Sequence, residues 1–233
     1  TAVREFFSGE FADAAALIPD LTAQFRDHPQ GHLGTIHTEP WACGPVLLLG
    51  DAAHAIVPFH GQGMNAAFED CALLDATLEA GATGGGDSNG RAGGSGAGAG
   101  AGAGGTNGAS GYDWQAIFAG FSSARRIDAE AIARMALENY SEMRSAVLDA
   151  RFLRRKAWAL QLERLHPERF IPRYAMVMFH PEISYSQALR RGAVQQGILD
   201  VLEAQRRPAT AGVSDALDAA ELHHARQLIT AQL

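Results

Sequence analysis

Residues 47–71 read LLLGDAAHAIVPFHGQGMNAAFEDC, and this stretch decides the fold. The apolar run 46–49 ends at Gly50 and Asp51, which is typical of a buried strand that stops at a turn. Residues 64–80 are predicted to form a helix, because four side chains recur there at helical spacing: Phe68, Cys71, Leu74 and Leu78. The stretch therefore predicts a strand–loop–helix unit over residues 46–80.

The loop of this unit has the chemistry of a ligand site. The Asp51 carboxylate can accept two hydrogen bonds from vicinal hydroxyls of a sugar or sugar alcohol. Gly61 and Gly63 flank Gln62 where the helix begins, so the backbone there carries no bulky side chain, and the amino end of a helix stabilises negative charge. A polyol joined to a flat anionic ring would suit both features. On spacing alone, ordinary turn residues remain an equal alternative.

The remainder of the chain is expected to be mainly helical, which makes the predicted fold class α/β with α+β character. Residues 113–233 have helical periodicity after Asp113, a predicted N-cap. One face of the first long helix there is shared by five residues: Ile132, Met135, Ala136, Asn139 and Met143. Residues 81–112, whose Gly/Ala tract is nearly half Gly, are expected to be a disordered insertion.

Three smaller features carry expectations of their own. Residues 33–38 alternate as a short strand does, and Phe6, Phe7 and Phe11 suggest a packed helix or loop. The Arg-rich runs 125–134 and 151–156 are expected to be solvated helix faces with i,i+4 ion pairs. His54 is expected to be structural, and His223 with His224 lacks the partners of a metal site.

Composition excludes several classes of protein. The chain has 233 residues, and 19 Lys and Arg against 26 Asp and Glu give a net charge of −7, which argues against a nucleic-acid or anionic-membrane partner. Two cysteines, Cys43 and Cys71, build no disulfide framework. No run approaches the roughly 18 apolar residues of a membrane span, and residues 1–7 lack the basic-then-apolar pattern of a signal peptide. We therefore expect a cytoplasmic protein without a membrane anchor.

The sequence GDAAHAIVPFHGQGMNAAFED at 50–70 resembles the second flavin motif of the class A flavoprotein aromatic hydroxylases. Within that class, the stretches IPDL, HPQGHLGT, ENYSEMR and RFIPRYAMV resemble the kynurenine 3-monooxygenase family, over about residues 5–80 and 113–200. The resemblance implies FAD as a non-covalent cofactor and NADPH as the reductant. It also implies a small aromatic amino-acid substrate, L-kynurenine, hydroxylated by molecular oxygen to 3-hydroxykynurenine.

The resemblance also implies roles for individual residues. Gly50 and Asp51 would hold the ribityl or ribose hydroxyls of FAD. The isoalloxazine ring would be lined by Pro58, Gly61, Gln62, Gly63, Met64, Asn65 and Ala66. The substrate would be contacted by Pro58, Phe59, His60, Asn139, Glu142, Met143 and Tyr174. His60 departs from the pattern, since many relatives have Phe there. No catalytic side chain is implied, because the flavin carries the chemistry.

By the same resemblance, residues 1–45 are the end of a substrate-domain sheet with its connection, 46–80 bind FAD, and 113–233 contribute to the substrate pocket. The family's N-terminal strand–GxGxxG–helix unit has no counterpart in this sequence. We therefore expect the C-terminal portion of a longer enzyme, inactive without its dinucleotide-binding portion. Two alternatives remain: a hydroxylase of another aromatic acid and a non-catalytic remnant. A GxGxxG unit encoded upstream in frame would favour an enzyme.

Overall fold

The computed structural model describes residues 2–84, 113–145, 149–206 and 216–233, and the chain divides into two compact units, 1–34 and 35–233. The predicted insertion 81–112 lies outside the described residues, except that 81–84 belong to the end of a helix. The boundary between the two units, at residues 34 and 35, falls inside the predicted segment 1–45. The roles assigned to the segments 1–45, 46–80 and 113–233 stay predictions.

The first unit consists of three short helices, α1 (Ala2–Glu10), α2 (Ala12–Leu17) and α3 (Leu21–Asp27). Aromatic rings hold it together. The Phe7 ring centroid lies 5.6 Å from that of Phe6, 5.9 Å from that of Phe11 and 6.1 Å from that of Phe25. Such tilted and edge-on pairs are favourable geometries for aromatic side chains. The expected helix is present and the rings contact one another, but Phe6 and Phe11 stay 57% and 49% exposed, so the expected packing is met only in part.

The second unit begins with a small antiparallel hairpin. Strand β1 (Ala42–Cys43) pairs with β2 (Val46–Leu47), so that Ala42 lies opposite Leu47 and Cys43 opposite Val46. The prediction of a buried strand over 46–49 is wrong in length and burial, since Val46 is 56% exposed. Among the described residues β2 has β1 as its single neighbour, so no larger sheet covers its outer side.

Residues 33–38 do not form the predicted strand. The segment is extended, but its amides bond to the turn of helix that follows the hairpin, α4 (Asp51–His54). The Ile36 N–H donates to the Ala55 carbonyl and the Thr38 N–H to the Ala53 carbonyl. A helical turn offers no row of evenly spaced partners, so a ladder cannot continue.

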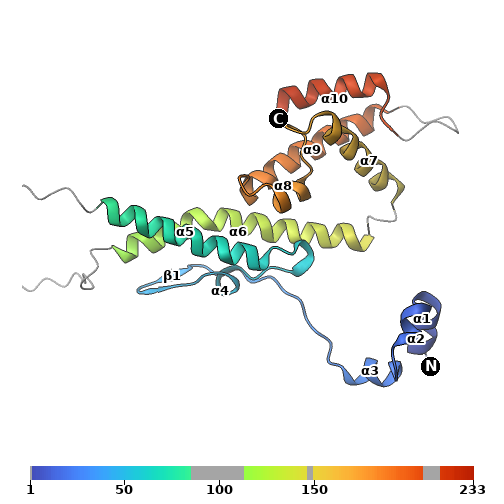
Figure 1. Ribbon diagram of the computed structural model, residues 1–233, viewed down its shortest axis with the longest axis horizontal. Coiled ribbons are helices and arrows are strands. Elements are labelled where there is room, and N and C mark those ends of the chain that lie inside the picture. Colours follow the sequence, from blue (N-terminus) through green and yellow to red (C-terminus); the bar gives the residue numbers. More distant parts are fainter. Residues whose placement is uncertain (1, 85–112, 146–148, 207–215) are drawn as a thin grey trace, which may run out of the picture. The chain divides into compact units, whose positions relative to one another are not determined.

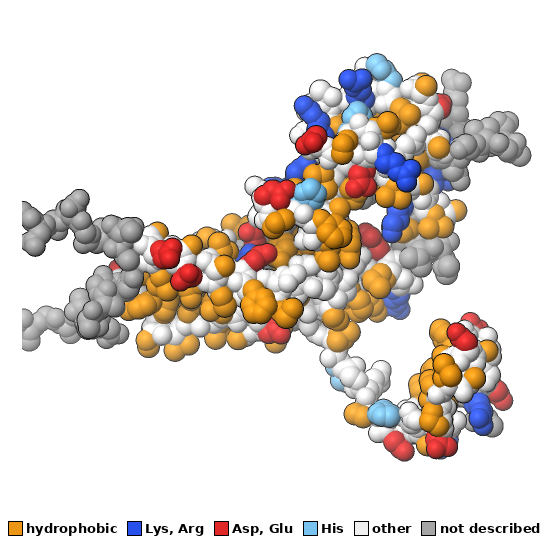
Figure 2. Space-filling view, in the orientation of Figure 1, with side chains coloured by type: hydrophobic (Ala, Val, Ile, Leu, Met, Phe, Trp, Pro, Cys, Tyr) orange, Lys and Arg blue, Asp and Glu red, His pale blue; other side chains and the backbone are white. Residues whose placement is uncertain are grey.

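The predicted helix after Gly63 is confirmed, but its predicted face is only partly buried: Leu74 packs against the core around Trp41, whereas Phe68 and Cys71 do not. α5 (Gly63–Gly84) lies beside α6 (Trp114–Ser145) and runs in the opposite direction (Figure 1). Phe68 is 64% exposed and Cys71 is exposed, whereas Ala66 and Asp70 are fully buried. Hydrophobic side chains accordingly cover much of the visible surface over α5 (Figure 2). The small Ala66 and an ion-paired Asp70 allow the close approach of α6.

α6 is the central element of the second unit. Asp113 caps it as predicted, because its carboxylate accepts the Ala116 N–H at 3.0 Å. The predicted face is confirmed for its first half, where Ile132, Met135 and Ala136 are fully buried. These side chains face three elements: the 3-10 turn η1 (Pro58–His60), α8 (Arg173–Phe179) and α9 (Tyr185–Gln205).

The remaining helices, α7 (Ala150–Leu165) and α10 (Ala219–Gln232), pack against α9 around a second apolar core. Its largest fully buried side chains are Trp158, Leu162, Phe170, Ile198 and Ile229. Side-chain caps start all three helices, with Asp149 on α7, Ser184 on α9 and Asp218 on α10. The described residues are thus mostly helical with two short strands, so the α/β prediction is met only in part.

The prediction that the Arg-rich runs are solvated faces is confirmed for some residues and wrong for others. Arg126 and Arg134 form the expected i,i+4 pairs with Glu130 and Glu138. Arg125, however, is 3% exposed and is paired with acids of α5. In the second run, the side chains of α7 pair across to α9: Arg154 to Glu203 and Arg155 to Asp200. Periodicity does not reveal such partners, since they come from another element.

Two findings bear on broad class. In the part of the chain that the structure describes, no helix combines the length and the apolar character needed to cross a membrane. Nor do any three His, Cys, Asp or Glu side chains of the described residues gather in a way that could hold a metal ion.

Candidate functional site

The turn between the hairpin and α4 has a backbone that only glycine adopts readily. Gly50 has φ +54° and ψ −137°, and a Cβ at this position would lie 2.9 Å from the Cβ of Ala67 on α5. The Gly50 N–H donates to the Asp70 carboxylate at 2.8 Å. Asp51 follows as the first residue of α4, and it is exposed. The turn therefore presents the Asp51 carboxylate outward from a backbone held against α5.

The amino end of α5 is open to a ligand. Gly61 is left-handed at φ +66°, and no described atom would lie within 4 Å of a Cβ placed there. The Ala66 N–H donates to the Gln62 carbonyl as the first bond of the helix, so the N–H groups of Gly63, Met64 and Asn65 precede it. Free amides with the helix dipole suit the anionic edge of a flat ring. The residues present thus fit the flavin ring that the sequence predicts here.

The side chain of Gln62 is engaged inside the protein. It is buried, and its Oε1 accepts hydrogen bonds from Asn65 Nδ2 at 3.0 Å and from the Tyr185 hydroxyl at 3.3 Å. Its Nε2 contacts the Met178 sulfur at 2.9 Å. Gln62 can therefore offer a ligand its backbone but not its amide side chain. Met64 and Asn65, by contrast, are exposed at the helix end.

Four of the predicted substrate residues meet at one place. The Asn139 side-chain amide donates to the Phe59 carbonyl. The Phe59 ring lies 4.5 Å from the Tyr140 ring, and the His60 ring is stacked at 5.2 Å on that of Tyr174. Long-range contacts between η1, α6 and α8 thus bring Phe59, His60 and Asn139 together with Tyr174. Met143 is exposed one turn further along α6.

Arg173, which the sequence analysis missed, connects another predicted substrate residue, Glu142, to this cluster. Arg173, at the start of α8, is paired with Glu138 and lies 3.5 Å from Glu142. Burial would raise the pKa of Glu138, but Arg134 and Arg173 outweigh it and hold that pKa below its ordinary value. The spacing of Glu138 and Glu142, one helical turn apart beside Asn139, was the available signal of a cationic partner.

His60 has an unsatisfied nitrogen in a buried position. Its side chain is 5% exposed, and its Nδ1 has no hydrogen-bond partner among the described residues. Burial, with a smaller contribution from the charge on Arg173, lowers the pKa of His60, although a backbone hydrogen bond opposes the shift. The shift favours the neutral imidazole, and its Nδ1 is a buried polar atom that lacks a protein partner in the described part of the chain.

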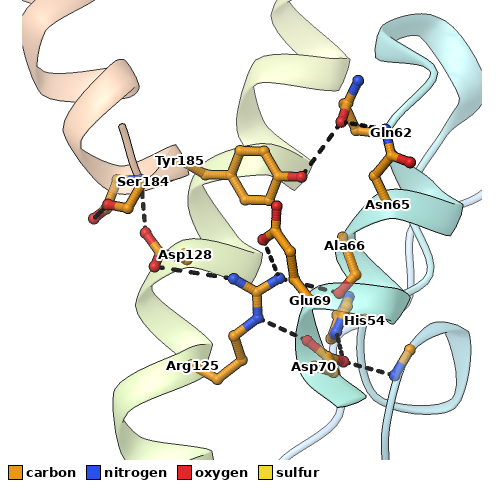
Figure 3. Close-up of polar contacts among 12 residues, drawn as sticks. His54, Gln62, Asn65, Ala66, Glu69, Asp70, Arg125, Asp128, Ser184 and Tyr185 are labelled. Carbon is orange, nitrogen blue, oxygen red and sulfur yellow. Dashed lines mark hydrogen bonds and ion pairs between the residues drawn. The ribbon is translucent and has the colours of Figure 1, made fainter. Parts of the chain in front are cut away.

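A buried polar network connects the Gly50–Asp51 turn to the amino end of α5 (Figure 3), and its members Asp70, Arg125 and Tyr185 were not among the predicted site residues. Asp70, fully buried, accepts hydrogen bonds from three donors: Gly50 N–H at 2.8 Å, His54 Nε2 at 2.7 Å and Arg125 Nε at 2.7 Å. Burial would raise the pKa of Asp70, but the hydrogen bonds from His54, Arg125 and Gly50 outweigh it and lower that pKa. The expectation that His54 is structural fits its place in this network.

The lowered pKa of Asp70 predicts a contribution to stability that acid removes. A carboxyl with a lower pKa in the folded state stabilises the fold above its unfolded pKa of about 4, and the effect is lost as the pH falls through the folded value. The difference in unfolding free energy between the wild type and Asp70→Asn should therefore be constant near neutral pH and shrink below about pH 4. Urea unfolding at a series of pH values measures it. A difference that persists undiminished into strong acid would contradict the prediction.

The geometry of the site fits a flavin, and the comparisons support FAD as the cofactor. Residues 10–90 match the family described as FAD binding domain. Kynurenine 3-monooxygenase from Cytophaga hutchinsonii is 41% identical over 202 residues, which cover 87% of this chain and 38% of the relative. The enzyme of that name from Xanthomonas campestris pv. campestris is 44% identical over 194 residues, covering 83% and 36%. The one from Myxococcus xanthus is 41% identical over 198 residues, covering 84% and 36%.

Over most of its length, therefore, the chain is similar to relatives named kynurenine 3-monooxygenase. This confirms the resemblance on which the residue roles were based, and it supports FAD as the cofactor. The chain spans less than two fifths of the length of these relatives.

Proposed function

We propose that this chain forms the flavin-ring and substrate side of an FAD- and NADPH-dependent monooxygenase that hydroxylates L-kynurenine to 3-hydroxykynurenine. The observation that carries the proposal is the open amino end of α5, next to the left-handed Gly61 and beside a Gly50–Asp51 turn bonded to the same helix. FAD, when bound and reduced by NADPH, would activate molecular oxygen, of which one atom enters the substrate ring and the other leaves as water.

Each part of the chain has a role in this proposal. Asp51 accepts hydrogen bonds from ribityl or ribose hydroxyls of FAD. The amides of residues 63–65 face the pyrimidine edge of the ring, where negative charge develops on reduction. Pro58, Phe59 and His60 separate flavin from substrate and exclude water. Two atoms supply polar contacts to the substrate: Nδ1 of His60, which has no partner among the described residues, and the side-chain Oδ1 of Asn139.

The test is a measurement on the complete gene product that carries these residues. It should bind FAD and oxidise NADPH faster when L-kynurenine is present, and 3-hydroxykynurenine should accumulate. Stimulation by another aromatic acid but not by kynurenine would identify a different hydroxylase of the class. Colourless protein that ignores added FAD would overturn the proposal.

Two substitutions test the pocket. Asn139→Ala and Tyr174→Phe should each raise the KM for kynurenine by roughly 5- to 150-fold, because a lost buried hydrogen-bond partner costs about 1–3 kcal/mol. Steady-state kinetics at saturating FAD measures the effect. Ser141→Ala is the matched control on α6, since its hydroxyl bonds the Leu137 carbonyl of the same helix. Wild-type KM values for both pocket variants would refute the assignment.

A further inference from the structure

We propose that Asp70 is a positioning residue for FAD, which acts by fixing the Gly50–Asp51 turn and by joining it, through Arg125 and Tyr185, to the loop at the amino end of α5. The inference rests on the proposed function and deepens it. Asp70 is fully buried, so it does not touch the flavin; it acts through groups that do.

The first step is the hold on the turn. Both oxygens of the Asp70 carboxylate are used: Oδ2 accepts from the Gly50 N–H and from His54, and Oδ1 accepts from Arg125. Gly50 precedes α4 and His54 ends it, so a single carboxylate is hydrogen-bonded to both ends of this helical turn. These two bonds fix the orientation of Asp51, which lies between them.

The second step leads from Asp70 to the other flavin-binding segment. The Arg125 guanidinium donates to the Ala66 carbonyl at 3.1 Å and lies 5.7 Å from the centre of the Tyr185 ring. The Tyr185 hydroxyl donates to Gln62 Oε1, and burial followed by the charge on Glu69 raises the pKa of Tyr185, so that it stays a donor. Gln62 is thereby held from α9, 123 residues away in sequence.

The third step is the register of α9 itself. Asp128, one turn after Arg125 on α6, accepts the Ser186 N–H at 2.8 Å and lies 3.9 Å from the Arg125 guanidinium. The amino end of α9, which carries Tyr185, is therefore attached to α6 through Asp128 (Figure 3). The two segments that hold flavin are in this way built as one unit before the ligand arrives.

Preorganisation of this kind raises the affinity for FAD, because the turn and the loop are already ordered and lose little conformational entropy on binding. Asp70→Asn replaces one carboxylate oxygen by an NH2 group, which donates hydrogen bonds and cannot accept them. Either Gly50 and His54 or Arg125 must therefore lose their acceptor. The dissociation constant for FAD should therefore rise about tenfold or more. Turnover at saturating FAD should return close to the wild-type value, since Asp70 touches no reacting atom. A general folding defect is distinguished by amide exchange, because it would raise exchange throughout the chain rather than over residues 50–54.

The experiment compares the complete gene product with three variants: Asp70→Asn, Tyr185→Phe and Asp75→Asn. Asp75 is an exposed acid on the same helix and serves as the control. FAD binding is measured by quenching of flavin fluorescence, and amide hydrogen exchange is measured on the FAD-free proteins. We expect weaker FAD binding and faster exchange over residues 50–54 for Asp70→Asn. For Tyr185→Phe we expect a smaller loss of affinity and faster exchange over residues 61–65. Asp75→Asn should change neither.

The outcomes separate this inference from the proposed function. Wild-type protein that does not bind FAD overturns the proposed function and, with it, any positioning role. Wild-type protein that binds FAD while Asp70→Asn binds it equally well overturns the inference alone. If Asp70→Asn does not fold, Tyr185→Phe decides, because it removes one hydroxyl and keeps the ring: unchanged affinity and unchanged exchange over residues 61–65 would overturn the link between the segments.

Discussion

Arg125→Met should lower the free energy of unfolding by about 3–5 kcal/mol, the cost of leaving a buried charge without its partner. Arg125 is buried, and its Nε lies 2.7 Å from the fully buried Asp70 carboxylate. Methionine has a similar length but donates no hydrogen bond, so Asp70 would lose its counter-charge and the Ala66 carbonyl a donor. The two other donors to Asp70, His54 and the Gly50 backbone amide, would remain, but the arginine contacts on Oδ1 would be lost.

The adjacent residue provides the control for that experiment. Arg126 is 43% exposed and forms ion pairs with Glu39 and Glu130 at the surface. Arg126→Met should cost about 0–1 kcal/mol, as exposed ion pairs usually do. Urea unfolding followed by circular dichroism compares the two variants with the wild type. Equal effects of the two substitutions would show that the Asp70 pair contributes no more than a surface pair.

Gly50→Ala should destabilise the protein by about 2–5 kcal/mol, because two costs add at this residue. The backbone conformation, φ +54° and ψ −137°, is strained for any residue with a Cβ. That Cβ would also lie 2.9 Å from the Cβ of Ala67, so either the turn or α5 must shift. A shift would move Asp51, and FAD affinity should fall together with stability.

Two other glycines separate these costs. Gly44 has φ +56°, but no described atom would lie within 4 Å of its Cβ, so Gly44→Ala should cost about 1–2 kcal/mol for the backbone alone. Gly120 lies within α6 with open space around it, and Gly120→Ala should stabilise by about 0.5–1 kcal/mol. Thermal unfolding of the three variants tests the order. If Gly50→Ala is no worse than Gly44→Ala, the close approach of Ala67 is unimportant.

Local patterns predicted the elements well where each element follows from its own residues. The helix after Gly63, the long helix after Asp113 and its buried Ile132 face all came from periodicity and capping. The Gly50–Asp51 turn followed from an apolar run that ends in a small and an acidic residue. Residues 33–38 and 46–49 were misjudged because a strand needs neighbours to extend and to cover it, and alternation does not reveal whether they exist.

The predictions of which helix faces are buried were partly wrong for a related reason. Apolar spacing placed Phe68 and Cys71 in the core, but α5 meets α6 through Ala66 and Asp70. Charge patterning placed Arg125 on a solvated face, because arginine is rarely buried without a partner. The partner, Asp70, is 55 residues away in sequence, beyond the reach of any helical period.

The sequence by itself determined the glycines and the acid of the loop between residues 50 and 63, and the similarity to relatives named kynurenine 3-monooxygenase, because these depend on which residue follows which. The tertiary structure alone decided how the loop is held: one buried carboxylate binds the turn, and an arginine and a tyrosine from α6 and α9 complete the contact. A charge becomes stable in the interior only when groups distant along the chain converge on it, and that convergence is a property of the folded molecule.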